Sequence, residues 1–480
     1  MQKGVLGVLL VTTAFAQLEL SDAPRTGAIL LGPTVATDYQ ALWVNPANLG
    51  FVPQTVTFSL GSPMEYGKYR LARQWSFGLL EAGASFSSDA LRFAQVAAMV
   101  LRFEQQRLSM EDKYRYARDF AGRGVAFNFD VQLFAGAFQS AAGWGGIGIG
   151  IRDRINAMLR FNSMLSRIAF LGRLDRYFDS IGVNWRGDTV GYARRPQYYS
   201  TLFDSSRLGV NWLRDYALGY GLQLYDGRSM QFYAGLTLRY IEGYIMLDGR
   251  IDNRVMTARS AISPFFDVNY GKATTPSLRQ GSGLIPVGRG YGVDGGVTAV
   301  FQQRWRAAIA VLDMGSVLWD GNVFAALDTV LNGMITTGFS SFDLFAEAQN
   351  ITGEGGYFKW TGLPSVRTLL PMRLRLGLSH SIGVERDIGV EATIPLRPSA
   401  PAAPPLTLSI GTRYSISDIV LISGGIRFGT LTIWSVPISV QITLWNGRWE
   451  IGLSFQDIAS LLIPKHPTLS LSLALLRFHF

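Results

Sequence analysis

The sequence has no cysteine among its 480 residues and only three histidines. Without cysteine the chain has no thiol nucleophile, no disulfide and no Cys-type metal site, which suits an exported protein that needs no disulfide framework. His380, His466 and His479 are scattered and lack the spacing of metal ligands. We therefore expect neither a metal nor another cofactor.

Long apolar runs are also missing. Beyond Ala16 no stretch of about 18 apolar residues occurs, although 48% of the chain is hydrophobic. This excludes a helical membrane protein. Apolar content without apolar runs is what a transmembrane β-barrel requires, because residues that face lipid alternate with residues that face the lumen.

Length alone would suggest about three soluble domains. Strand-like alternation nevertheless continues almost unbroken from residue 53 to the end, which predicts a single barrel over residues 51–480. We expect an all-β fold, a closed antiparallel transmembrane β-barrel of about 14 strands within a range of about 12 to 16. Short helices in such a chain must lie in loops, in the lumen or on the periplasmic side.

Signatures of enzymes are absent as well. No G-x-S-x-G motif occurs. Ser379 and His380 are adjacent, and adjacent residues of a strand point to opposite faces, so they cannot act together as nucleophile and base. We expect no enzymatic activity.

The segment Gly143–Gly148 formally fits the dinucleotide-binding pattern G-x-G-x-x-G. It has no acidic partner in a βαβ unit, and its glycines alternate with Ile147 and Ile149 in the manner of a strand. We therefore interpret these glycines as places where a barrel strand bends or where another segment approaches closely.

The N-terminal residues have the form of a secretory signal peptide. Lys3 provides a basic start, residues 4–13 form a short apolar stretch, and Ala14-Phe15-Ala16 has the small-x-small form of a cleavage site. We expect residues 1–16 to be removed and the mature chain to start at Gln17. The alternative is an ordinary buried N-terminal helix.

The C-terminal segment, residues 469–480, alternates apolar and other residues and finishes on an aromatic ring. This is typical of the closing strand of an outer-membrane barrel, with Leu476, Phe478 and Phe480 directed to lipid for membrane insertion. The leucines from Leu469 to Leu475 are out of phase with these three residues. Either a bulge lies near Leu475-Leu476 or the lumen wall is apolar there.

Strands are clearest in the last quarter of the chain. Alternation predicts strands over residues 372–379, 406–411, 420–428, 438–444 and 449–456, and Asn446-Gly447 between the last two is a strong hairpin signal. Trp445 and Trp449 flank this turn as an aromatic girdle would. If Phe480 lies at the periplasmic rim, the turns at 446–447 and 415–418 are periplasmic and the Pro-rich segment 397–405 faces outward.

Earlier strands are predicted over residues 55–60 and 231–240, with a hairpin over 291–311 that turns at 302–304. Two segments have helical patterns instead. Residues 109–120 begin with Ser109-Met110-Glu111-Asp112, which has the form of a capping box. Residues 153–171 carry apolar side chains at helical spacing.

The formal net charge of +9 falls to +8 when Lys3 is removed with the signal peptide. Such a balance could favour anionic ligands or lipopolysaccharide phosphates. We favour the interpretation that the excess positive charge belongs to the loops and rims of the barrel, because no run of Lys and Arg and no interleaving of basic with aromatic residues occurs. No nucleic-acid partner is expected.

Several motifs carry a resemblance to a known family. The segment 37–50, Thr-Asp-Tyr-Gln-Ala-Leu-Trp-Val-Asn-Pro-Ala-Asn-Leu-Gly, resembles the Asn-Pro-Ala region of the FadL-like (long-chain fatty-acid transporter) superfamily of outer-membrane barrels. Further motifs at 292–297, at 311–315 with Trp319, and at 370–377 resemble a largely uncharacterised Bacteroidota-type branch, a domain of unknown function. Together these motifs span most of the mature chain.

In that superfamily the N-terminal segment enters the barrel and helps to plug it. The resemblance therefore implies a lumen plug over residues 17–50, whose turn includes Asp38, Trp43, Asn45, Pro46 and Ala47. The alternative is a simple turn that leads into the first strand, since Asn-Pro is a turn signal by itself. In either case the proline restricts its neighbour and a turn forms.

The resemblance also implies a function: passive uptake of hydrophobic or amphiphilic small molecules across the bacterial outer membrane. Implied partners are such a molecule, outer-membrane lipid and lipopolysaccharide, and the barrel-assembly machinery. A sibling branch of the superfamily acts as a shuttle or anchor for surface proteins. The competing hypothesis is therefore a non-transporting scaffold that tethers a secreted or periplasmic partner.

Overall fold

The structure is a computed structural model. It describes residues 29–51, 54–58, 68–72, 74–93, 95, 107–140, 143–341, 358–383, 385–397, 406–429, 434–462 and 467–480. The expected signal peptide, the predicted start at Gln17 and His466 lie outside these residues.

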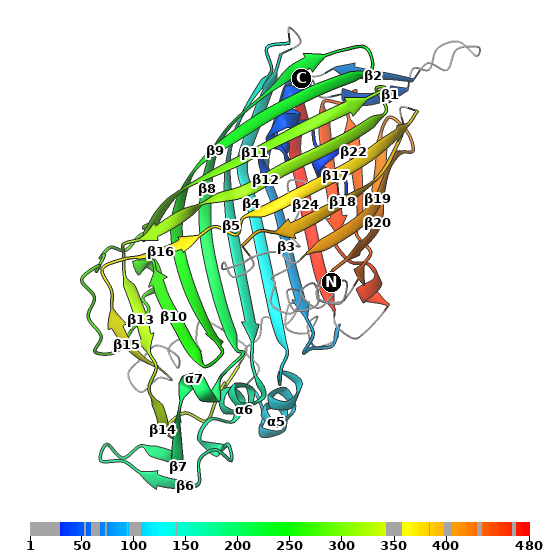
Figure 1. The fold of residues 1–480 in the computed structure, drawn as a ribbon. Helices are drawn as coiled ribbons and strands as arrows, with labels where there is room; N and C mark the ends of the chain where they lie inside the picture. The colour runs from blue at the N-terminus through cyan, green and yellow to red at the C-terminus, as the bar shows by residue number, and fades with distance from the viewer. Residues whose placement is uncertain are drawn as a thin grey trace, which may run out of the picture.

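The chain forms a closed antiparallel barrel of 14 strands (Figure 1), which confirms the predicted fold class. The first and last barrel strands pair with each other, with His479 opposite Ser76 and Leu469 opposite Phe86. The barrel strands are β3 (Trp75–Ser88), β4 (Gly124–Gln139), β5 (Gly146–Arg160), β8 (Arg207–Asp226), β9 (Met230–Asp252), β11 (Gly288–Phe301), β12 (Trp305–Trp319), β17 (Arg373–Ile382), β18 (Arg386–Pro395), β19 (Thr407–Ser415), β20 (Val420–Phe428), β22 (Ile438–Leu444), β23 (Trp449–Phe455) and β24 (Thr468–His479).

The alternation of each strand separates an outward apolar face from an inward polar face. On β24, Ser472 and Arg477 are buried inside the barrel, whereas Leu473 and Leu476 are exposed on the outside. The phase change between them is a bulge in β24, because the single residue of β23 between Glu450 and Gly452 opposes two residues of β24, Leu475 and Leu476. Of the two alternatives for this strand, the bulge is confirmed.

The two rims of the barrel differ. Short turns at 227–229, 302–304, 416–419 and 445–448 lie at one rim together with Phe480, as the hydrogen bond from the His479 backbone N–H to the Arg448 carbonyl illustrates. We call this the short-turn rim. Long connections at the opposite, long-loop rim carry most of the elements outside the barrel (Figure 1). Most of the Pro-rich segment 397–405 lies outside the described residues, but its flanking strands meet at the long-loop rim.

Beyond the long-loop rim, β10 (Val255–Ile262), β13 (Val323–Leu327), β15 (Lys359–Gly362) and β16 (Val366–Leu369) extend the wall next to β9 and β12. The strands β6 (Ser180–Val183), β7 (Thr189–Tyr198) and β14 (Val330–Met334) form a separate three-stranded sheet at the far end of the molecule (Figure 1). The two-residue strand β21 (Trp434–Ser435) pairs with β20.

Helices occur in the loops and in the lumen. They are α2 (Gly32–Val35), α3 (Ala41–Val44), α5 (Met110–Asp119), α6 (Ser163–Leu171) and α7 (Tyr199–Leu202), with short 3-10 turns η2 (Pro46–Gly50), η3 (Gly172–Leu174), η4 (Pro264–Phe266) and η5 (Ala459–Leu461). Among the described residues, no helix is both long and apolar enough to cross a bilayer.

Two predictions of local structure have different outcomes. The capping box of the first predicted helix is confirmed, since the Ser109 and Asp112 side chains accept each other's backbone N–H at the start of α5. The second predicted helix, residues 153–171, is wrong in its first part. Residues 153–160 belong to β5, where Asp153 pairs with Arg214 on β8, and only Ser163–Leu171 is helical. Cross-strand pairing therefore overrode the apolar spacing of this segment.

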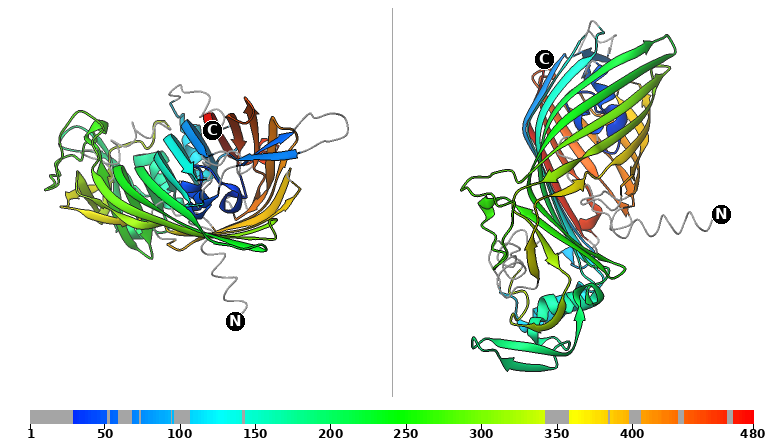
Figure 2. Two further views of the ribbon diagram at one scale, coloured as in Figure 1. Left: turned by 90° about the horizontal axis from the view of Figure 1, so that it is seen from above. Right: turned by 60° about the vertical axis from the view of Figure 1, so that its left-hand side comes forward.

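The predicted strand near residue 56 exists as β1 (Gln54–Phe58). It pairs with β2 (Lys68–Ala72) in a separate two-stranded sheet, so the barrel sheet itself begins at β3. Upstream of β1, residues 29–51 lie inside the ring of barrel strands, as Figure 2 shows from above. We call residues 29–51 the lumen segment.

Candidate functional site

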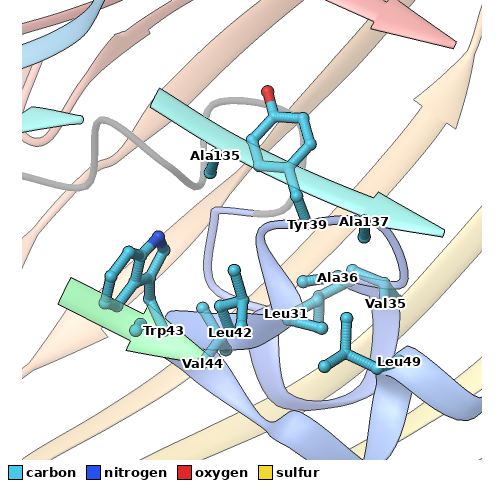
Figure 3. Close-up of a cluster of buried hydrophobic side chains, with 12 residues drawn as sticks. Leu31, Val35, Ala36, Tyr39, Leu42, Trp43, Val44, Leu49, Ala135 and Ala137 are labelled. Atoms are coloured by element: carbon cyan, nitrogen blue, oxygen red, sulfur yellow. The ribbon is translucent and has the colours of Figure 1, made fainter. Parts of the chain in front are cut away.

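The lumen segment fills the barrel next to the short-turn rim. Its apolar side chains form one buried cluster, in which small residues of the wall, Ala135, Ala137 and Ala217, receive the large side chains of the segment (Figure 3). The segment contributes Leu31, Val35, Ala36, Tyr39, Ala41, Leu42, Trp43, Val44 and Leu49 to this cluster. Small wall residues leave the interior space that the segment occupies, so wall and segment are complementary in size.

The wall is also shaped for the turn at Asn45–Leu49. A Cβ atom at Gly235 of β9 would lie 2.2 Å from the Pro46 carbonyl oxygen, and one at Gly296 of β11 would lie 2.0 Å from Asn45 Oδ1. Both distances are impossible contacts, so these two positions require glycine for the segment to lie where it does.

The glycine-rich motif at residues 143–148 has the same explanation. Gly146 begins β5, and a Cβ there would lie 2.2 Å from the Leu49 carbonyl oxygen. The interpretation that these glycines permit close approach of another segment is therefore confirmed at this position.

Asn45, Pro46 and Ala47 form the turn that contacts β9 and β11. Asn45 is extended, with φ −162°, and its Oδ1 accepts a hydrogen bond from the Ala47 backbone N–H at 3.2 Å. Its Nδ2 donates to the Pro33 carbonyl oxygen at 3.0 Å and to Thr298 Oγ1 at 2.8 Å. Asn45 thus caps the turn, joins two parts of the lumen segment and ties both to the wall.

Asp38 and Trp43, the other two residues of the predicted turn, contact different parts of the wall. Trp43 Nε1 donates to Gln132 Oε1 at 2.9 Å, and the Arg152 guanidinium lies over its ring at 4.3 Å. Asp38 Oδ2 lies 4.0 Å from His479 Nε2 on the closing strand. All five residues lie inside the barrel, but they form three separate attachments to it.

A hydrogen-bonded network fixes the segment to the seam where the barrel closes. The Tyr39 hydroxyl donates to Glu81 on β3 and accepts from Arg477 Nε on β24, and Arg477 Nε also lies 3.0 Å from Glu81 Oε1. Gln132 Nε2 donates to Glu81 Oε2 at 2.9 Å, which joins this network to Trp43. His479 is buried inside the barrel, and its Nε2 lies 3.1 Å from Glu450 Oε2.

A second network crosses the middle of the lumen, and we call it the polar belt. It consists of charged side chains from β5, β8, β9, β11, β12 and β17, all buried except the partly buried Arg154: Arg152, Arg154, Asp215, Arg239, Asp294, Asp313 and Arg373. Asp313 is its centre, with Arg154 at 3.0 Å, Arg239 at 2.8 Å and Arg373 at 3.3 Å.

The other carboxylates of the polar belt are equally well matched. Asp215 Oδ2 lies 2.7 Å from Arg154 Nε, and Asp294 Oδ2 lies 2.9 Å from Arg239 Nε. Asp130 of β4 is the direct cross-strand neighbour of Arg154. Buried ions without partners would be very unfavourable, so the close matching of Arg with Asp is what makes this layer stable.

An apolar pocket lies beyond the polar belt, on the side of the long-loop rim. On β5, Leu159 lies five positions beyond the belt residue Arg154 and therefore on the opposite, outer face of the strand, and its cross-strand neighbour Leu208 shares that face. We call this cavity the outer pocket. It has a volume of about 110 Å³, lies between this outer face and α6, and is lined by Leu159, Phe161, Leu165, Ala169, Phe203, Ser206, Arg207, Leu208, Leu247, Gly249, Arg250, Ile251, Met256, Ala258, Phe339, Phe358 and Trp360.

The polar belt was not predicted from the sequence, although its signal was present. Three of the motifs on which the family resemblance rests contain Asp294, Asp313 and Arg373. The triplet Arg152-Asp153-Arg154 was assigned to a predicted helix from residue 153 onward. Charged residues at inward positions of apolar strands indicate such a layer, but which positions face inward at the same level depends on the register of strands that are far apart in the sequence.

The family is decided by the sequence match over these same strands. The sequence model of DUF5723, a family of unknown function, matches residues 73–420. The chain belongs to this family. This confirms the predicted relation to a largely uncharacterised branch.

Solved structures of similar length match the fold at low identity. They include the toluene transporter TodX of Pseudomonas putida, at 12% identity with a TM-score of 0.41, covering 96% of this chain and 99% of that one. The toluene transporter TbuX of Ralstonia pickettii has 10% identity, a TM-score of 0.44 and coverages of 95% and 98%. A FadL homologue of Pseudomonas aeruginosa has 9% identity, a TM-score of 0.43 and coverages of 97% and 99%. Among curated proteins none matches.

Proposed function

We propose that this member of DUF5723 is an outer-membrane channel for passive uptake of hydrophobic or amphiphilic small molecules, and that the lumen segment is its plug. The observation that carries the proposal is the outer pocket, an apolar cavity that opens on the long-loop side. Small-molecule sites are commonly concave, mostly apolar and supplied with a few polar groups. Arg207 and Arg250 supply such groups here.

The outside of the barrel supports a membrane location. Large apolar side chains are exposed around the wall on consecutive strands, among them Leu218, Leu236, Ile309, Leu378 and Ile410. In water this surface would promote association, whereas in hydrocarbon it is the expected outer face of a transmembrane barrel. A cleaved signal peptide over residues 1–16 is part of this proposal.

The polar belt and the lumen segment restrict passage through the barrel. An apolar molecule that enters the lumen meets buried Arg and Asp side chains, and separating their pairs would leave charges without partners. The belt belongs to the wall strands, whereas the lumen segment is a separate insert next to it. Passage therefore requires displacement of the lumen segment.

Reconstituted vesicles test the uptake function. Leu247→Trp should fill the outer pocket and reduce entry of a hydrophobic fluorescent dye several-fold. Leu236→Trp is the matched control, because Leu236 lies on the same strand but does not line the outer pocket. Equal dye entry in both variants would contradict capture at the outer pocket.

A second candidate function is a scaffold for a protein partner. The sheet of β6, β7 and β14 exposes Ile181, Val183 and, in the loop between β6 and β7, Trp185, whose side chain is 87% exposed. Exposed apolar side chains at a site away from the barrel wall mark an interaction surface. If the protein with and without residues 17–50 passes neither dye nor sugar in vesicles, uptake is rejected and the scaffold is favoured.

A further inference from the structure

A basic cavity lies outside the lumen, between the end of β3, the helix α5 and the start of β4. It has a volume of about 630 Å³ and is lined by Asp89, Ala90, Leu91, Arg92, Gln95, Arg115, Arg118, Asp119 and Arg123. Four of these residues are arginines and two are aspartates. We call this cavity the arginine pocket.

Its carboxylates do not balance its arginines. Asp89 Oδ1 accepts a hydrogen bond from the Gly124 backbone N–H at 2.6 Å, and Asp119 lies 3.9 Å from Arg118 Nε. Arg92 and Arg123 are exposed, and neither forms a side-chain ion pair with any residue that the structure describes. Within the described residues, the pocket therefore presents two guanidinium groups without an ion-pair partner to an incoming anion.

The helix α5 holds the other two arginines in place. Its capping box fixes the first turn, and Arg115 is held between Asp112, at 2.5 Å, and the ring of Tyr116, whose centroid lies 4.9 Å from the guanidinium. Arg118 lies one turn further along the same helix. Planar guanidinium groups suit the bidentate recognition of phosphate oxygens.

The position of the arginine pocket relative to the apolar outer face of the barrel indicates which kind of phosphate compound the pocket can contact. On β4, Phe127 is exposed on the outside and stacks near Phe129, as in the aromatic girdle of a membrane barrel. Arg123 precedes Phe127 by four positions and is exposed directly before the start of β4. At about 3.4 Å per residue it lies up to about 14 Å further toward the long-loop rim, within reach of the level of lipid headgroups.

We propose that the arginine pocket binds the phosphate of a phosphorylated lipid headgroup in the leaflet next to the long loops. The proposal rests on the proposed membrane location but not on uptake. Headgroup phosphates flank the apolar band on which Arg123 continues, and this continuity favours a lipid over a free anion. Lipid bound here would anchor the β3 to β4 connection to the membrane surface.

The test uses the full-length protein in lipid nanodiscs, with bound lipid counted by native mass spectrometry. A lipid with a phosphate-monoester headgroup is titrated against a zwitterionic lipid with the same chains, and inorganic phosphate is titrated separately. The double variant Arg92→Gln, Arg123→Gln is compared with Arg194→Gln, Arg195→Gln, which makes the same change of charge at exposed positions of β7.

We expect the pocket variant to bind the phosphate-monoester lipid at least about tenfold more weakly, with the β7 variant unchanged, as the loss of charge-assisted hydrogen bonds predicts. Equal lipid binding by both variants would overturn the proposal. Loss of inorganic phosphate binding with lipid binding intact would overturn the lipid as the ligand. Dye uptake by the pocket variant should equal that of the original protein, so failure here is distinguishable from failure of the uptake function.

Discussion

The two halves of the molecule are built on opposite principles. Next to the short-turn rim the interior of the barrel is filled, with the lumen segment packed against alanine and glycine and tied to the closing seam through Tyr39. Toward the long-loop rim an apolar pocket lies between the outer face of the wall and α6. The polar belt separates the two. In the proposed function, the outer pocket captures an apolar molecule and the lumen segment closes the barrel. These are different elements, so each role can be changed without the other.

The largest effect is expected from a substitution in the polar belt, which separates the two halves. Arg239→Met removes one arginine from between Asp215, Asp294 and Asp313 and takes from the buried Asp294 carboxylate the guanidinium with which it pairs. The free energy of unfolding should fall by about 3–5 kcal/mol. Denaturant unfolding in detergent measures this. In Arg279→Met the lost pair with Asp320 is partly exposed, so a decrease within about 1 kcal/mol is the control.

A change in the wall of the filled half should come next. Gly235→Val pushes a side chain into the Pro46–Ala47 turn, which should displace the lumen segment, cost about 1–3 kcal/mol and raise ion conductance across a planar bilayer several-fold. Gly295→Val is the matched control on the neighbouring strand, because its Cβ meets no atom within 4 Å. An unchanged conductance in Gly235→Val would show that the segment does not close the barrel.

A smaller effect should follow from removing the cap of that turn. Asn45→Ala removes the donor to Pro33 and Thr298 and the acceptor for Ala47, and should lower stability by about 1–3 kcal/mol. Protease sensitivity of the lumen segment in intact vesicles is the direct measurement. The outer pocket of this variant should bind the dye with unchanged affinity, and a loss of that affinity would contradict the separation of the two halves.

The smallest effect is expected outside both halves. The hydrogen bond from Ser109 lowers the pKa of Asp112 at the start of α5. Its contribution to the helix is therefore complete at neutral pH and is lost as the pH falls through that lowered pKa. Asp112→Asn should destabilise α5 by about 0.5–1 kcal/mol at pH 7. Hydrogen exchange of α5 should show no such difference at a pH below the pKa, and dye uptake should be unaltered.

The filled half was partly predictable from the sequence. Period-2 alternation, the Asn446-Gly447 hairpin and the terminal aromatic residues predict the closed barrel, because these signals are local to one strand or one turn. The phase change at Leu475-Leu476 was visible as an anomaly, and the register of β24 against β23 identifies it as a bulge.

The polar belt and the outer pocket were not predictable in the same way. Asp313 meets Arg154 and Arg239 only because barrel closure brings β12, β5 and β9 to one level. The outer pocket likewise combines strand residues with Phe339 and Phe358 from a long connection. Such sites depend on strand register across the whole ring, which no single segment of sequence contains.

One measurement tests most directly whether the lumen segment closes the barrel. The Thr34 Cγ2 atom lies 3.0 Å from the position of a Cβ at Gly377 of β17, so Thr34→Cys with Gly377→Cys can form an S–S bond of about 2.05 Å in a chain that has no other cysteine. In vesicles, dye entry should stop when this pair is oxidised and return when it is reduced, with each single variant insensitive to oxidation. Equal dye entry in the oxidised and reduced forms of the double variant would contradict the account.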